Sequence, residues 1–266
     1  MFPVGKDLWK GNDELAVSIW TDPIKHIKCW NRCPYIPTDM DYFDEFPQIG
    51  VSGIAIDPND SNIIFIATGD DDAADSFSAG VFKSLDGGLN WNETGLNPSN
   101  QTQFDVLNEI VISPDDSNVI WVAGTQGLLK SIDGGDTFEI KQAGNITDFK
   151  VKPNDASIIY AVSGDTGATF NSAAPTQFFK SVDGGETFTQ NQDIIPANAG
   201  RIVLGVSPAD PEVVYALVAD KTNNDSIFLG LFKSSDSGES FVQTENTENI
   251  FESSQAWFDL ALEVSP

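Results

Sequence analysis

The chain has 266 residues, of which 40% are hydrophobic, and this composition fits a globular protein rather than a disordered one. Forty acidic residues against fourteen basic ones give a net charge of -26, which repels a phosphate backbone and excludes nucleic-acid binding. No apolar run approaches the roughly 18 residues that a membrane span needs, so we expect no transmembrane segment.

The first 47 residues carry only a weak pattern. Residues 8–13 (LWKGND) are similar to the start of a motif that recurs later, and they predict part of one more repeat unit, followed by an inserted loop. That loop contains Cys29 and Cys33, which are either bridged or free, and with His26 they are too few for a structural zinc site. No signal-peptide pattern follows Met1, so we expect this chain to be a piece of a larger polypeptide.

A repeat occupies residues 48–266. Four segments, spaced by about 50 residues, share the pattern Ser-x-Asp-x-Gly-x-x-Trp/Phe, and each follows an apolar residue and a lysine. Upstream of each segment an apolar strand ends in a Pro-x-Asp turn. The segments are 84–91, 131–138, 181–188 and 234–241, and their turns contain Pro58, Pro114, Pro153 and Pro208. A truncated fifth copy begins at residue 264.

Each unit therefore predicts four short strands, with the repeated motif in the hairpin between the third and fourth. Asp accepts hydrogen bonds from nearby backbone amides in such a turn, and Gly supplies positive φ. Units of this length with four strands are typical of propeller blades. The sequence predicts an all-β fold, a β-propeller of four-stranded antiparallel blades. Residues 1–47 hold a partial preceding blade, 48–266 hold at least four full blades, and the whole propeller is expected to be larger.

The motif resembles the Asp-box, or BNR, repeat. That repeat occurs in sialidases, xyloglucan-hydrolysing glycosidases, sortilin-type receptors and secreted bacterial repeat proteins, and the last group is the most similar. The resemblance implies an extracellular or cell-surface location. It also implies that Asp86, Asp133, Asp183 and Asp236 stabilise hairpins on the face away from any active site.

Loops between the second and third strands vary in length, and binding sites are commonly built on such loops. We expect them to share a face with the starts of the inner strands, around a central channel. The resulting rim is polar and mostly acidic, which suits a sugar or a cation but is also what an ordinary solvated rim looks like. The candidate ligand-binding residues are Asp70, Asp72, Glu109, Asp148, Arg201, Trp257 and Asp259.

One loop offers a candidate metal site. Asp70, Asp72 and Asp75 lie within six positions, and Ca²⁺ prefers such oxygen ligands. Their spacing does not follow the EF-hand pattern, and alternate side chains of an extended loop can instead point apart into water. Calcium is the one cofactor the sequence suggests.

The residue composition also disfavours some classes of enzyme. A sialidase holds its substrate carboxylate with three arginines, and this chain has only Arg32 and Arg201. The single histidine lies outside the repeats, which disfavours a nucleophilic triad. We therefore expect a recognition or scaffold module for a glycan or a protein rather than an enzyme. The alternative is a glycoside hydrolase with an acid and a base among Asp70, Asp72, Glu109 and Asp259.

Overall fold

The computed structural model describes residues 50–69, 78–97, 99, 105–164, 176–191, 195–220, 228–245 and 260–265. Within these ranges the chain forms sixteen β-strands and no helix, which confirms the all-β prediction. It follows that the described residues provide no helix capable of crossing a membrane. The partial unit predicted for residues 1–47, with both cysteines, lies outside the described residues.

The sixteen strands form four separate antiparallel sheets of four strands each, as predicted. Blade 1 contains β1 (Val51–Ile56), β2 (Ile64–Thr68), β3 (Val81–Ser84) and β4 (Asn92–Glu93). Blade 2 contains β5 (Leu107–Ile112), β6 (Ile120–Gly124), β7 (Gly127–Ser131) and β8 (Glu139–Ala143). Blade 3 contains β9 (Ile146–Val151), β10 (Ile159–Ser163), β11 (Gln177–Ser181) and β12 (Thr189–Asn191). Blade 4 contains β13 (Ala199–Val206), β14 (Val214–Asp220), β15 (Phe228–Ser234) and β16 (Val242–Gln243).

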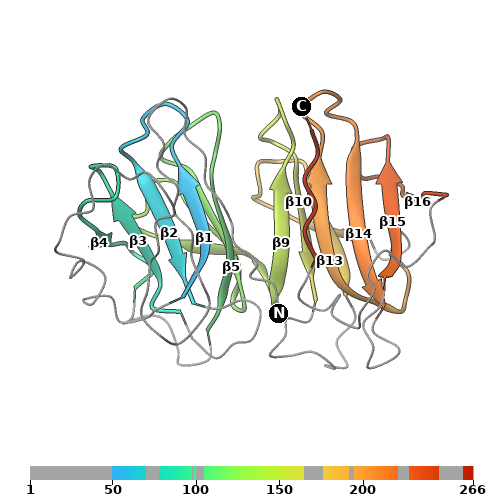
Figure 1. The fold of residues 1–266 in the computed structure, drawn as a ribbon, viewed down its shortest axis with the longest axis horizontal. Coiled ribbons are helices and arrows are strands. Elements are labelled where there is room, and N and C mark those ends of the chain that lie inside the picture. The colour runs from blue at the N-terminus through green and yellow to red at the C-terminus, as the bar shows by residue number, and fades with distance from the viewer. Residues whose placement is uncertain are drawn as a thin grey trace, which may run out of the picture.

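The blades are arranged around an axis, with their first strands inside. β1 packs beside β5, β5 beside β9, and β9 beside β13, so the inner strands follow one another in chain order. The fourth strands lie outermost, and Figure 1 shows β4 and β16 at opposite edges of the molecule. This is the arrangement of a β-propeller, and it places the inner-strand side chains around the axis.

Successive blades are held together by apolar clusters. Blade 1 contributes Phe65 and blade 2 contributes Ile110 to one cluster, and Trp121 and Phe149 join blades 2 and 3 in another. The second strand of each blade is almost wholly apolar because neighbouring blades or connections cover both of its faces. These clusters explain why the second strands are continuous apolar runs and do not alternate between polar and apolar residues.

Each Ser-x-Asp-x-Gly hairpin is held by hydrogen bonds within its own eight residues. The Ser131 hydroxyl donates to Asp133 Oδ1 (2.8 Å) and accepts from the Gly135 N–H (2.9 Å). Asp133 also accepts from the Thr137 N–H (2.9 Å) and hydroxyl (2.6 Å), and these bonds lower the Asp133 pKa to about 2. The other three hairpins repeat the serine–aspartate and serine–glycine bonds. The predicted position of every motif, between the third and fourth strands, is confirmed.

We expect Ser131→Ala to lower the free energy of unfolding by about 1–3 kcal/mol, because the buried Gly135 N–H loses its acceptor. Urea denaturation would measure the change. Ile132→Ala is the matched control, since its side chain on the same hairpin is 70% exposed and should contribute less than about 0.5 kcal/mol. Equal losses in both variants would contradict the role of the serine.

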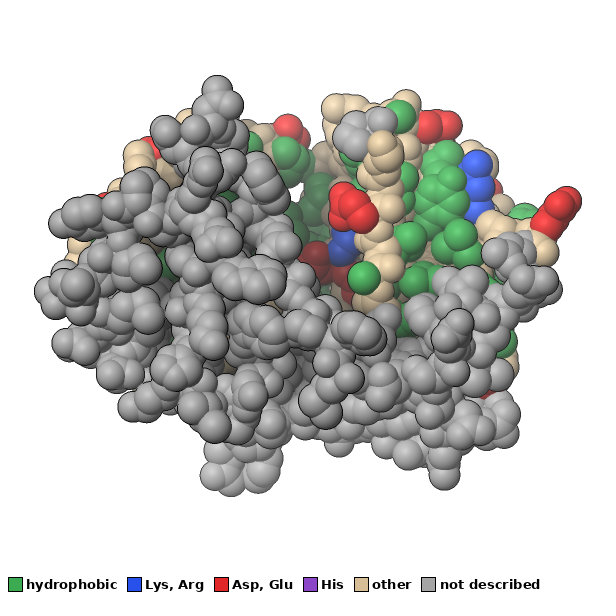
Figure 2. Space-filling view, in the orientation of Figure 1, with side chains coloured by type: hydrophobic (Ala, Val, Ile, Leu, Met, Phe, Trp, Pro, Cys, Tyr) green, Lys and Arg blue, Asp and Glu red, His purple; other side chains and the backbone are tan. Residues whose placement is uncertain are grey.

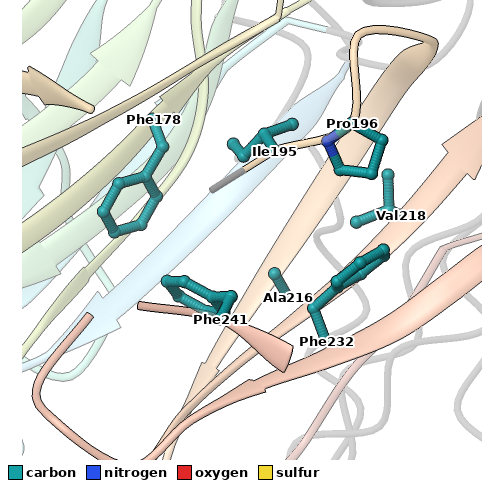
Figure 3. A pocket seen from close by; sticks show the side chains of 7 residues that line it. All are labelled: Phe178, Ile195, Pro196, Ala216, Val218, Phe232 and Phe241. Carbon is teal, nitrogen blue, oxygen red and sulfur yellow. The ribbon is translucent and has the colours of Figure 1, made fainter. Parts of the chain in front are cut away.

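A small apolar cavity lies between blades 3 and 4 (Figure 3). Its volume is about 10 Å³, roughly the space of one water molecule, so it is a packing gap rather than a ligand site. Phe241, the last residue of the blade 4 hairpin, lines it and packs edge-on against Phe178 of blade 3 with ring centroids 5.5 Å apart. The aromatic position of this hairpin therefore joins two blades.

Candidate functional site: the axial hollow

The two ends of the blades carry different connections. Each Ser-x-Asp-x-Gly hairpin bonds to the turn between the first and second strands, as in the Gly134 N–H to the Asn118 carbonyl (2.9 Å). At the other end, the residues after the second strand meet the connection from the preceding blade, as in the Gly164 N–H to the Asn145 carbonyl (3.2 Å). We call these the hairpin face and the loop face. The division agrees with the one predicted from loop lengths.

A hollow runs between the inner strands. Figure 2 shows it between the half that contains β1 and β5 and the half that contains β9 and β13, with acidic and basic side chains inside. Because strand one of every described blade borders the axis, charged residues on these strands meet there even though they are distant in sequence. The axial hollow is the candidate site.

Three charged side chains meet at the axis. Lys150 Nζ, on β9, donates to Glu109 Oε1 on β5 (2.8 Å) and to Asp148 Oδ1 on β9 (2.6 Å). Asp148 and Lys150 are two residues apart on one strand, so both project from the same side. The Glu109 side chain is 27% exposed and that of Asp148 is 9% exposed. One ammonium thus bridges two carboxylates from adjacent blades, and part of the cluster reaches solvent.

The second oxygen of each carboxylate accepts a backbone N–H from the next blade. Glu109 Oε2 accepts from Phe149 (3.2 Å), and Asp148 Oδ2 accepts from Leu204 (2.6 Å). An inner strand is a sheet edge whose outward N–H groups have no strand partner, and the carboxylates supply acceptors for them. At the equivalent position of blade 1, a Cβ added to Gly53 would lie 3.1 Å from the Ile110 nitrogen. Gly53 has no side chain, so among the described blades the carboxylate contact is made at the two interfaces where Glu109 and Asp148 lie.

The pKa values of Glu109 and Lys150 in this cluster are shifted. Burial raises the pKa of Glu109 to about 8, and the neighbouring Asp148 charge adds to this rise, while Lys150 opposes it. Burial also works against the charged form of Lys150, but Asp148 and Glu109 outweigh it and raise the Lys150 pKa. With both carboxylates ionised the cluster carries one negative charge, and a proton on Glu109 makes it neutral.

We expect the wild type to lose stability relative to Glu109→Gln as pH rises from about 4.5 to about 8. The folded-state pKa of Glu109 is raised, so the folded protein holds a proton that the unfolded chain has released in this window. Because the side chain is partly exposed, we expect the difference to change by about 1–2 kcal/mol rather than by the full shift. Because the chain has only one histidine, few other groups titrate between these pH values. Urea denaturation at pH 5, 6.5 and 8 measures the free energy of unfolding of both proteins. If this free energy changed equally with pH in the wild type and in Glu109→Gln, the prediction would be contradicted.

Of the predicted ligand-binding residues, the structure brings Glu109 and Asp148 together. Arg201 lies on β13, partly buried. The remaining candidates for ligand or calcium binding fall outside the described residues and stay predictions: Asp70, Asp72, Asp75, Trp257 and Asp259. In the part of the chain that the structure describes, no three His, Cys, Asp or Glu side chains are grouped as metal ligands.

Sequence reasoning missed Lys150. The signal was present, because Asp148 and Lys150 have the spacing that places two side chains on one face of a strand. Asn108 adds a second polar feature beside the cluster. Its amide donates to the Ile146 carbonyl (2.6 Å), while its Oδ1 is buried without a hydrogen-bond partner among the described residues.

No family model matches the sequence. A curated xyloglucanase from a Paenibacillus species is 30% identical over 185 residues, which are 67% of this chain and 16% of that protein. The chain therefore spans about a sixth of the length of the relative it matches.

Solved structures show the same fold. An ancestral GH74 enzyme superposes with a TM-score of 0.56 at 23% identity, over 75% of this chain and 24% of that one. The GH74 xyloglucanase from Xanthomonas campestris gives a TM-score of 0.52 at 14% identity, over 75% of this chain and 39% of that one. The extracellular domain of a one component system from B. thetaiotaomicron gives 0.53 at 11% identity, over 96% of this chain and 28% of that one. The chain is thus a β-propeller with sequence similarity to a xyloglucanase.

Proposed function

We propose that the chain is part of an extracellular or cell-surface β-propeller that binds a polysaccharide of the xyloglucan class on its loop face. The observation that carries the proposal is its 30% identity to the Paenibacillus xyloglucanase over 185 residues. A polysaccharide ligand is consistent with the charge of -26, since a neutral polymer is not repelled by an acidic surface as a polyanion is. We propose an extracellular or cell-surface location because a polysaccharide ligand of this class is encountered outside the cell.

The axial hollow supplies the polar part of the site. Glu109, whose side chain is 27% exposed, presents its carboxyl group to sugar hydroxyls in the hollow, beside the nearly buried carboxylate of Asp148. Lys150 holds these two carboxylates in place through the bonds of 2.8 and 2.6 Å. In the proposal Asp70, Asp72, Arg201 and Asp259 surround this centre, and the ring of Trp257 packs against a sugar face.

We further assign the four hairpins to the Asp-box class. Their support is the repeated hydrogen-bond set, in which the serine hydroxyl and the aspartate carboxylate satisfy the turn amides. The bonds use both carboxylate oxygens of Asp133 and Asp183, so these groups have a structural role. They also lie on the face opposite the proposed binding surface.

A glycoside hydrolase is the second candidate, and the xyloglucanase relative favours it. The raised pKa of Glu109 suits a general acid, which must carry a proton near neutral pH. Hydrolysis also needs a second carboxylate about 5–9.5 Å away across an open cleft. Glu109 and Asp148, however, share one lysine and accept backbone N–H groups, so binding is the function that the described geometry supports better.

Calorimetric titration of a xyloglucan oligosaccharide into the chain tests the proposal, with reducing-end release measured on the same samples. We expect binding without release. Asp70→Asn/Asp72→Asn should weaken binding about tenfold, the effect of losing one hydrogen bond to a charged group. Ile132→Ser, at an exposed position of the hairpin face, should bind as the wild type does.

Release of reducing ends that stops in the Asp70→Asn/Asp72→Asn variant would establish the hydrolase instead. Absence of both binding and release in the folded chain would contradict the proposal altogether. A xylan oligosaccharide of similar length serves as the ligand control, and equal heats for both sugars would show that the recognition is not of the proposed class.

A further inference from the structure

Blade 2 ends in a short turn on the loop face. Its second and third strands, β6 and β7, are joined by only two residues, Thr125 and Gln126. The equivalent connections of the other described blades are longer, and they comprise residues 69–80, 164–176 and 221–227. A Cβ on Gly127, at the end of the short turn, would lie 2.3 Å from the Gln142 carbonyl oxygen. The turn therefore lies directly against the fourth strand, and blade 2 ends in a low surface.

This low surface leads outward from the axial hollow. β5, β6, β7 and β8 follow one another from the axis to the outer edge, and neighbouring strands lie about 4.8 Å apart, so the path from β5 to β8 is about 14 Å long. It begins beside Glu109 on β5 and ends where β8 leads into Gly144. We call Thr125, Gln126 and residues 142–144 the shelf. Blades 1 and 3 flank blade 2 on its two sides, so the shelf does not arise from an end of the described chain.

The shelf is uncharged. Its five residues are Thr, Gln, Gln, Ala and Gly, in a chain with a net charge of -26. Each of the three longer connections contains at least one aspartate, such as Asp70, Asp165 and Asp225. Ala143 and Gly144 are exposed, and the other shelf residues are half-buried, so part of each side chain reaches solvent. Blade 2 thus presents a neutral polar surface on an otherwise acidic protein.

Hydrogen bonds fix the direction of both glutamine amides on the shelf. Gln126 Nε2 donates to Oδ2 of the buried Asp105 (2.7 Å). An ionised carboxylate only accepts hydrogen bonds, so the nitrogen of this amide faces Asp105 and its Oε1 faces the other way. Gln142 Nε2 donates to the Ala143 carbonyl (3.1 Å), which fixes the second amide for the same reason. Among the described residues, none donates a hydrogen bond to either Oε1.

These groups match the chemistry of a neutral sugar chain. An amide oxygen accepts a hydrogen bond from a hydroxyl group, and the shelf has no charge with which to hold an ion. Ala143 and Gly144 add little bulk, and a Cβ on Gly144 would meet nothing within 4 Å, so there is room for a sugar ring above them. A path of about 14 Å is longer than a single sugar ring, so more than one unit fits along it.

We propose that the shelf extends the sugar site, so that the polysaccharide backbone passes from the axial hollow over blade 2 to the outer edge of the propeller. The inference rests on the proposed function, and it adds the direction of the chain and two residues that bind it. Gln126 and Gln142 accept hydrogen bonds from sugar hydroxyls through Oε1. Affinity should then depend on the length of the oligosaccharide, because only a longer backbone reaches the shelf from the hollow.

Calorimetric titration with xyloglucan oligosaccharides of increasing backbone length tests this inference. We expect the dissociation constant of the wild type to fall as the backbone lengthens, until the shelf is filled. Gln126→Ala/Gln142→Ala should bind the long oligosaccharides about tenfold more weakly, the effect of losing two neutral hydrogen bonds. The same variant should lose most of the gain in affinity that length gives to the wild type.

Two single variants complete the test. Gln142→Ala should fold normally, since its amide bonds only to the adjacent Ala143 carbonyl among the described residues, and it should weaken binding of the long oligosaccharides about threefold. Gln190→Ala is the matched control, because it removes an exposed glutamine from β12, the outer strand of blade 3, and it should bind as the wild type does.

The outcomes separate this inference from the proposed function. If the wild type bound every length equally, or if Gln126→Ala/Gln142→Ala gained affinity with length as the wild type does, the inference would be overturned and the proposed function would stand. Equal losses in Gln142→Ala and Gln190→Ala would also overturn it. Absence of binding at every length in the folded wild type would remove both.

Discussion

Gly185→Ala should lower the free energy of unfolding by about 3 kcal/mol or more. Gly185 has φ of 80°, a left-handed conformation that costs an L-residue about 1–2 kcal/mol. The added methyl would also lie 2.2 Å from Trp121, where overpacking adds about 1–3 kcal/mol. Both effects act at the joint between blades 2 and 3, so the loss should appear in urea denaturation as a lower midpoint.

Gly184→Ala is the matched control. Gly184 precedes Gly185 in the same hairpin and has φ of 70°, but a Cβ there would meet nothing within 4 Å. The control should therefore show only the backbone cost of about 1–2 kcal/mol. Equal losses in the two variants would mean that contact between the hairpin and the ring of the preceding blade does not hold the blades together.

Asp148→Ala should cost about 2–4 kcal/mol of unfolding free energy, the second large effect that we expect. The substitution leaves the buried Leu204 N–H without its acceptor and removes one of the two carboxylates that neutralise Lys150. Because Asp148 contacts a strand of blade 4 from blade 3, its loss weakens the interface at the axis. Thermal and urea unfolding would both measure it.

Asp148→Asn separates the two causes. The amide oxygen still accepts from Leu204, but the charge opposite Lys150 is lost. We expect this variant to recover part of the stability lost in Asp148→Ala. A variant Asp148→Asn as unstable as Asp148→Ala would assign the whole effect to charge, while wild-type stability in Asp148→Ala would refute the structural role of the cluster.

The blades and hairpins were predictable from sequence because their determinants are local. Ser131, Asp133 and Gly135 bond to one another within five residues, so the motif itself specifies the turn. The same local pattern at four places fixed the order of strands and put every hairpin between the third and fourth strand. Periodic sequence and local turn chemistry agree throughout, which is why the fold prediction was confirmed.

Contacts between blades were not predictable in the same way. The lysine that precedes each motif was visible in the sequence, but its partner lies in a hairpin about 50 residues further on and depends on how blades are rotated. Glu109 and Lys150 meet for the same reason, through neighbouring inner strands of two blades. The acidic loop with Asp70, Asp72 and Asp75 has no repeated counterpart in the other blades, so no internal comparison constrained it.

The most direct test of the proposed binding face is hydroxyl-radical footprinting of the chain with and without a xyloglucan oligosaccharide. The exposed side chains of Leu85, Ile132 and Val182 report the hairpin face, and Trp257 reports the rim predicted for the loop face. We predict that the sugar protects Trp257 and leaves the three hairpin-face residues unchanged. Protection of Leu85, Ile132 and Val182 with an unprotected Trp257 would contradict it.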